Sequence, residues 1–159
     1  MDMKKIIGMI LVAAILFSAF ACGEAMDERL LDTFERCRGA IGAITQGNFV
    51  VAIQCLNVSS LMSDRLKTIV KAKCPSLVGS VPELTYGVAW VENGEWYLSI
   101  PVVEPNYKSA PCMIFKLDSD YRVFSADFTD WADVSYRYAQ SPVIKWNVEY
   151  IPDYVVMVD

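Results

Sequence analysis

The hydrophobic pattern of this chain changes its period between residues 75 and 82. Before this segment, apolar residues recur at three-, four- and seven-residue spacing, which is the pattern of amphipathic helices. After it, apolar and polar residues alternate, and all four tryptophans and all eight tyrosines lie between Tyr86 and Tyr154. Aromatic and β-branched residues in alternation favour strands. A chain with helices first and strands after them is expected to fold as an α+β domain.

Three helices are expected before this segment, over residues 26–46, 48–56 and 60–73. The first has one apolar face, formed by Leu30, Leu31, Phe34, Cys37, Ile41 and Ile44. Asn48 suits the N-cap of the second helix, although the apolar run over residues 49–53 also fits a strand. Pro75 ends the third helix because proline cannot continue one.

Asn93-Gly94 is a strong hairpin signal, and it predicts strands over residues 86–92 and 95–101. With this turn, one face of the hairpin is apolar and is expected to face the core, with Ala89, Val91, Trp96, Leu98 and Ile100. The opposite face is mixed and is expected to be half covered, with Val88, Trp90, Glu92, Glu95 and Tyr97.

A second hairpin is expected over residues 112–117 and 121–127, around Asp118-Ser119-Asp120. A fifth strand over residues 144–150 and a final short run over residues 154–158 follow it. The predicted fold class is therefore α+β. Two or three N-terminal helices (residues 26–74) pack on an antiparallel sheet of four to six strands (residues 84–158).

The N-terminus has the pattern of a secretory signal. Lys4 and Lys5 precede an apolar run over residues 6–21, and small residues end the run. The run has 16 residues, whereas a membrane-spanning helix needs about 20. Residues 1–21 are therefore expected to be a signal peptide, and residues 22–159 a single exported domain. Three alternatives are open for processing of this signal: cleavage before Cys22, cleavage before Met26, and lipidation of Cys22 as the first residue of the mature chain.

The Ala21-Cys22-Gly23 junction resembles that of bacterial lipoprotein signals, although Ala19 and Phe20 depart from the usual residues. This resemblance implies that Cys22 is the lipid attachment site and that the protein is held on a membrane in the cell envelope. The order of elements, with a Gly47-Asn48-Phe49 turn, resembles NTF2-like and cystatin-like domains. That similarity concerns architecture and implies no catalytic residues.

Four cysteines remain after Cys22, and an exported chain meets an oxidising compartment. An even set predicts two disulfides, unless some of the four are small buried hydrophobic residues. Cys37 and Cys55 lie at similar distances from the predicted turn at residues 46–47, which favours a Cys37–Cys55 bridge and leaves Cys74–Cys112. The spacing contains no C-x-x-C pair, so no metal site is expected.

The net charge of −5 argues against a nucleic-acid partner. The sequence has no histidine, which excludes a Ser-His-Asp triad and histidine-ligated zinc. The candidate acidic cluster is Asp127, Asp130 and Asp133, which would share one side of a helical turn and hold a hard cation. The preferred interpretation is that Asp127 and Asp130 cap a helical turn.

The sequence carries no motif that names an activity. The function expected from it is that of an exported, lipid-anchored cell-envelope protein that binds a protein partner or a small ligand, without a cofactor. One alternative is a histidine-independent hydrolase that uses Asp127, Asp130 and Asp133. Another is a secreted inhibitor or exclusion factor.

Overall fold

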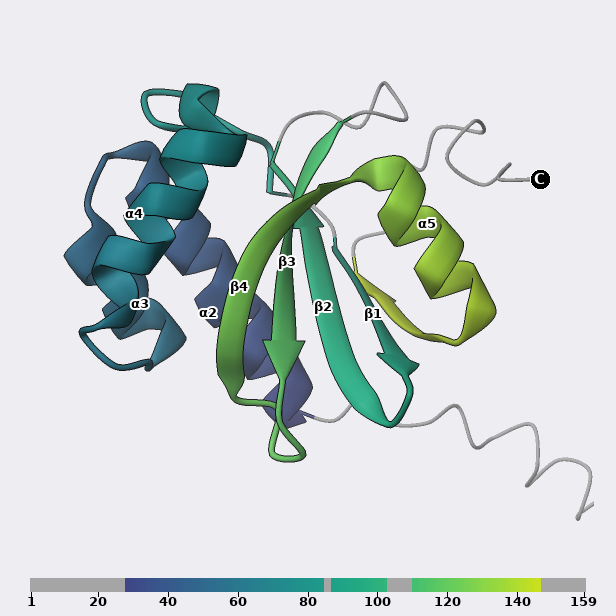
Figure 1. Ribbon diagram of the computed structural model, residues 1–159. Coiled ribbons are helices and arrows are strands. Elements are labelled where there is room, and N and C mark those ends of the chain that lie inside the picture. Colours follow the sequence, from purple (N-terminus) through teal and green to yellow (C-terminus); the bar gives the residue numbers. More distant parts are fainter. Residues whose placement is uncertain (1–27, 85–86, 103–109, 147–159) are drawn as a thin grey trace, which may run out of the picture.

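The computed structural model describes residues 28–84, 87–102 and 110–146 (Figure 1). The predicted signal peptide, Cys22 and the predicted strand residues beyond 146 lie outside these ranges. The described part contains helices and an antiparallel sheet in the order that the sequence predicted. The predicted α+β class is confirmed.

The three expected helices form close to their predicted bounds, as α2 Glu28–Thr45, α3 Phe49–Leu56 and α4 Met62–Lys73. A short 3-10 helix, Pro75–Leu77, follows α4. The second segment is a helix and not a strand because both of its ends are capped. Asn48 Oδ1 accepts a hydrogen bond from Val51 N at 3.1 Å, and Asn57 adopts the left-handed conformation that ends the helix.

The sheet has five strands in the order β4-β3-β2-β1-β5, and every neighbouring pair is antiparallel. The strands are β1 Gly87–Glu92, β2 Glu95–Pro101, β3 Pro111–Leu117, β4 Val123–Asp130 and β5 Pro142–Trp146. Asn93 and Gly94 both have positive φ, as a tight two-residue hairpin turn requires. The predicted register follows, with Val91 opposite Trp96.

Helices cover both faces of the sheet. Helices α2, α3 and α4 pack on one face, where Ala89, Leu98 and Ile100 belong to the larger core (Figure 1). The other face is covered by a fourth helix, α5 Trp131–Gln140, whose Trp131 packs with Trp90. The sequence predicted this second face to be half covered. Its centre is in fact closed, because Trp90 is fully buried.

Gly87 allows α2 to lie close to the sheet. A Cβ atom at this position would lie 2.5 Å from the Phe34 ring of α2 and 3.0 Å from the backbone oxygen of Ser99. The first distance is shorter than real Cβ contacts, and the second is tighter than most of them. The start of β1 is therefore fitted to the first half of α2, and this contact fixes the helix over the sheet.

Candidate ligand-binding cleft

One end of the molecule contains a cleft of about 440 Å³. Its walls are the first turns of α2, the end of α3 and the turn between β3 and β4, here called the β3–β4 turn (residues 118–122). In Figure 1 these segments meet at the lower end of the molecule. The lining residues are Glu28, Arg29, Asp32, Thr33, Arg36, Leu56, Asn57, Asp120, Tyr121, Arg122 and Val123.

The β3–β4 turn is held by its own first residue. Asp118 Oδ1 accepts hydrogen bonds from the backbone amides of Asp120 at 2.8 Å and Arg122 at 2.9 Å. The backbone amide of Asp118 also donates to the Arg122 oxygen at 3.0 Å. Aspartate favours such turns because its short side chain reaches backbone amides just ahead of it. The turn is therefore a defined wall of the cleft.

Tyr121 connects this turn to the rest of the fold. Its φ of 61° lies in the left-handed region, which a non-glycine residue adopts at a cost of about 1–2 kcal/mol. The Thr33 hydroxyl of α2 donates to the Tyr121 oxygen at 2.7 Å. The Tyr121 ring also packs edge-on against Trp96, with 4.9 Å between the ring centroids. These contacts maintain the strained backbone in a wall of the cleft.

The charged side chains of the cleft are equal in number for the two signs: three arginines and three carboxylates. Arg36 Nε donates to Asp32 Oδ2 at 2.6 Å within α2. The Arg29 guanidinium carbon lies 5.3 Å from the centroid of the Tyr121 ring. Arg29 Nη1 lies 3.9 Å from Asp120 Oδ1, which is an ion-pair distance but too long for a hydrogen bond. The short ion pair thus lies within α2, and the Arg29–Asp120 ion pair between α2 and the β3–β4 turn is longer.

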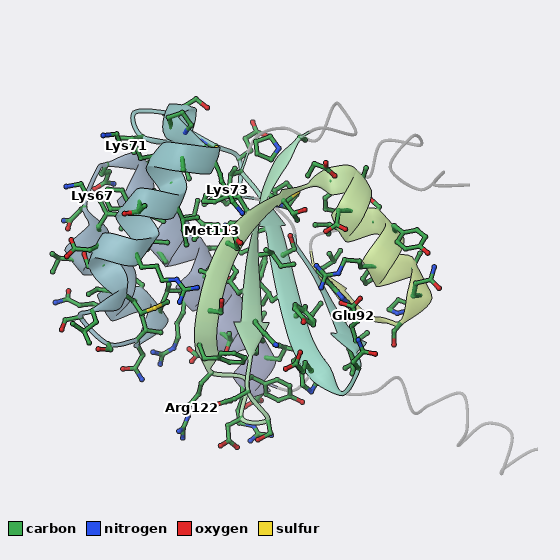
Figure 2. The ribbon with its side chains drawn as sticks, in the orientation of Figure 1. Lys67, Lys71, Lys73, Glu92, Met113 and Arg122 are labelled. Carbon is green, nitrogen blue, oxygen red and sulfur yellow. The ribbon has the colours of Figure 1, made fainter. Side chains whose placement is uncertain are left out.

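The remaining two charged groups of the cleft are unpaired within the described part of the chain. The Arg122 guanidinium has no hydrogen bond or ion pair there, and neither has the Glu28 carboxylate. Both residues are exposed. Figure 2 shows Arg122 beside the β3–β4 turn, at the end of the molecule opposite the upper part of α4. An unpaired cation and an unpaired anion are the groups that a polar ligand would meet first.

The lining of the cleft is rich in charged hydrogen-bonding groups. It includes no serine, cysteine or lysine, and its only aliphatic hydroxyl, on Thr33, is engaged by a backbone oxygen. The lining residues therefore supply no serine, cysteine or lysine nucleophile. Arginine and carboxylate side chains instead offer charged hydrogen bonds with defined geometry.

The three aspartates of the predicted acidic cluster lie outside this cleft and serve the fold. Asp130 is the N-cap of α5 and accepts a hydrogen bond from the Asp133 amide at 2.8 Å, as the preferred interpretation predicted for Asp130. Asp133 accepts from the Thr129 hydroxyl at 3.0 Å and lies 3.5 Å from Arg137 Nη1. Among the described residues, no group of three acidic or cysteine side chains is placed to hold a metal ion.

Asp127 points to a different neighbour. Its Oδ1 accepts hydrogen bonds from Lys73 Nζ of α4 and from the Phe128 amide, both at 2.7 Å. Asp127 therefore forms an ion pair and not a helix cap. Burial acts to raise the pKa of Asp127, but these two hydrogen bonds outweigh burial and hold the pKa below its ordinary value. The group is an ionised anchor between α4 and β4.

The aromatic segment of α5 packs against the sheet. Arg137 lies over the rings of Tyr97 at 4.6 Å and Trp90 at 5.1 Å, and its Nε donates to Glu92 Oε2 at 3.0 Å. This stacking closes the lower end of the α5 face. Tyr136 remains 57% exposed.

The four predicted disulfide cysteines are free thiols in the structure. Cys37 and Cys74 lie in the core beneath α2–α4, with Cys55 packed against it, whereas Cys112 lies on the opposite face under α5. A disulfide needs facing Cβ atoms, and the separate positions of Cys74 and Cys112 give the predicted pairing no support. The two predicted disulfides stay predictions. Cys55 Sγ lies near Gly39 and is not bonded to Cys37.

Comparison with protein-family models, with curated proteins and with solved structures gave no match. The resemblance to NTF2-like and cystatin-like domains stays a prediction. Within the described ranges, no helix has the length and apolar character needed to cross a membrane.

Proposed function

We propose that this protein is exported, is anchored in the cell envelope by lipid on Cys22, and acts by binding a small polar ligand in the cleft. The anchoring part of this proposal rests on the leader over residues 4–23. The binding part rests on one observation. The cleft has three arginines and three carboxylates in its lining, and Arg122 and Glu28 have no partner among the described residues.

The cleft is also prepared for binding before a ligand arrives. The Asp118 side chain fixes the turn, and Thr33 fixes Tyr121 against α2. A wall that is already ordered loses little conformational entropy on binding, so more of the contact energy becomes affinity. The volume falls within the range of about 300–1,000 Å³ that is usual for small-molecule sites.

The hydrolase alternative receives no support from these contacts. Asp127, Asp130 and Asp133 are each engaged in a structural interaction, and none of them lines the cleft. A general acid in a glycosidase needs a raised pKa, whereas the pKa of Asp127 is lowered. We therefore retain ligand binding as the proposed function.

Expression of the full-length chain with its own leader in a bacterial host tests the anchoring. We expect wild-type protein in the membrane fraction, with acyl chains on an N-terminal Cys22. The variant Cys22→Ser should lose both the acyl mass and the membrane association, whereas the control Cys55→Ser should keep both. Soluble wild-type protein that begins at Met26 would contradict the proposal.

A further inference from the structure

We infer that the cleft recognises a zwitterionic phospholipid head group, with a phosphate ester and a primary ammonium, as in phosphatidylethanolamine. This inference rests on the proposed lipid anchor at Cys22, and it names the ligand class of the same cleft. The unpaired Arg122 holds the phosphate, and the unpaired Glu28 holds the ammonium.

The balance of charge in the lining favours a zwitterion. A purely anionic ligand would gain from Arg122 but would also lie near Glu28, Asp32 and Asp120. A purely cationic ligand would meet the opposite conflict with the arginines. A head group with one charge of each sign satisfies both unpaired side chains and leaves the Arg36–Asp32 pair intact. Arginine suits the phosphate because its planar fork donates two hydrogen bonds to neighbouring oxygens.

The position of the cleft along the chain favours a lipid as the source of this head group. Cys22 precedes Glu28 by six residues, which span at most about 20 Å when fully extended. Glu28 begins α2 and is itself part of the cleft wall. A chain anchored at Cys22 therefore keeps the cleft within about 20 Å of the bilayer surface.

This tether also lowers the affinity that the cleft needs. Linking a site to the surface that carries its ligand replaces a bimolecular encounter with an intramolecular one, at an effective ligand concentration in about the millimolar range. A shallow, exposed site with two unpaired charges is adequate at such a concentration. Lys67 and Lys71 lie on α4, away from Arg122 (Figure 2).

The first experiment titrates the purified, naturally processed protein in detergent with O-phosphoethanolamine and follows backbone amide chemical shifts. We expect saturable shifts at Asn57 and Arg122. Inorganic phosphate and ethanolamine should each bind at least about tenfold more weakly, since each satisfies only one charged group. No saturable shift at either residue, or phosphate binding as tight as that of O-phosphoethanolamine, would overturn the inference.

Matched variants assign the two contacts. Arg122→Gln and Glu28→Gln should each weaken O-phosphoethanolamine binding about tenfold, because each removes one charged hydrogen-bonding partner. The controls Arg65→Gln and Glu83→Gln remove the same charges at exposed positions outside the cleft, and they should bind as wild type does. If the cleft and control variants weakened binding equally, the loss would come from the change in net charge, and the assignment of Arg122 and Glu28 would be overturned.

The second experiment separates a lipid from a soluble source. The acylated protein is reconstituted in vesicles of phosphatidylcholine alone or mixed with phosphatidylethanolamine, and amide hydrogen exchange is measured. We expect added protection over residues 28–36 and 118–123 only with phosphatidylethanolamine, whose ammonium carries N–H donors. Arg122→Gln should abolish this protection.

These experiments distinguish failure of the lipid anchor at Cys22 from failure of head-group recognition in the cleft. Binding of soluble O-phosphoethanolamine with equal exchange in both vesicles would overturn the lipid source. An acylated Cys22 without any zwitterion binding would overturn the inference and leave the anchor in place. A protein without acyl mass on Cys22 would overturn the anchor directly, whatever the cleft binds.

Discussion

Tyr121 shows how single residues build the cleft. Its left-handed backbone persists because the Thr33 hydroxyl, 88 residues away in the chain, donates to its carbonyl oxygen. Strained residues of this kind often lie at functional sites, where the surrounding structure maintains them. Arg122 follows at the next position, where it is exposed and its guanidinium has no partner among the described residues.

Thr33→Val tests this support. The change keeps the shape of the side chain and removes the hydroxyl that donates to the Tyr121 oxygen. We expect the free energy of unfolding to fall by about 1–2 kcal/mol, measured by urea denaturation, and zwitterion binding to weaken. Thr68→Val is the matched control, because its hydroxyl donates to a backbone oxygen on an exposed face of α4. Equal losses in the two variants would contradict a special role for Thr33.

The Asp127 carboxyl makes the free energy of unfolding depend on pH. Its pKa in the folded protein is below the ordinary value, so its ion pair with Lys73 stabilises the fold above about pH 4 and loses this effect as the pH falls through the folded pKa. Because both side chains are half exposed, Asp127→Asn should cost at most about 1 kcal/mol at pH 7.

Urea denaturation of Asp127→Asn and of wild type at several pH values checks the direction of this pH dependence. The difference from wild type should be largest near neutral pH and should shrink as the pH falls below the ordinary aspartate pKa of about 4 and through the lower folded pKa. The exposed Glu83→Gln variant is expected to match wild type throughout. A difference that grows as the pH falls would show that the carboxylate does not act as an ionised partner.

The cysteines differ in accessibility, and alkylation can report it. Burial raises the pKa of the Cys37, Cys74 and Cys112 thiols, whereas Cys55 is partly exposed. In native protein we expect a thiol reagent to label Cys55 first, read by peptide mass spectrometry. After denaturation without reductant, all four cysteines should label, because all four are free thiols in the structure. A peptide linked through Cys74 and Cys112 would contradict the fold.

At the scale of single residues, the sequence indicated the capping role of Asp130 but not the cleft. A helix cap is a local pattern, readable within a few positions. The cleft depends on Arg122 and Glu28, which are distant in sequence and become neighbours only through the packing of α2 against the β3–β4 turn. Asp118-Ser119-Asp120 predicted the hairpin turn, and Asp120 in this turn lines the cleft.

Among the elements, α2, α3, α4 and the first hairpin were predictable because each has a local signal. The periodic apolar face, the Asn48 cap and the Asn93-Gly94 turn each act within a few residues. Helix α5 was missed because it is short and rich in aromatic residues, which favour strands in isolation. Its stability comes from the Asp130 cap and from burial of Trp131 and Val134, which is tertiary.

The contact between α2 and β1 can be tested with two glycines. Gly87→Ala would place a Cβ atom against the Phe34 ring and a backbone oxygen, so we expect a loss of about 1–3 kcal/mol in the free energy of unfolding. Gly42→Ala meets no atom within 4 Å and should stabilise α2 by about 0.5–1 kcal/mol. Thermal or urea denaturation compares them. A neutral Gly87→Ala variant would show that α2 does not lie so close to the sheet.

For the whole molecule, the sequence predicted the class and the direction of helix packing but not the closure of the second sheet face. The strand alternation showed Val88 and Trp90 on one side, and nothing local indicated that α5 would return to cover them. The resulting arrangement leaves the open, charged surface of the cleft at the end where α2 begins. That end is also the nearest to Cys22 along the chain.

The central claim, that the chain is held on a membrane through Cys22, is tested most directly by the intact mass of the natively processed protein. Full-length protein made in a bacterial host with its own leader would be measured under non-reducing conditions. The account predicts a chain that begins at Cys22 and carries the added mass of acyl chains. A chain without acyl mass that begins at Met26 would contradict it.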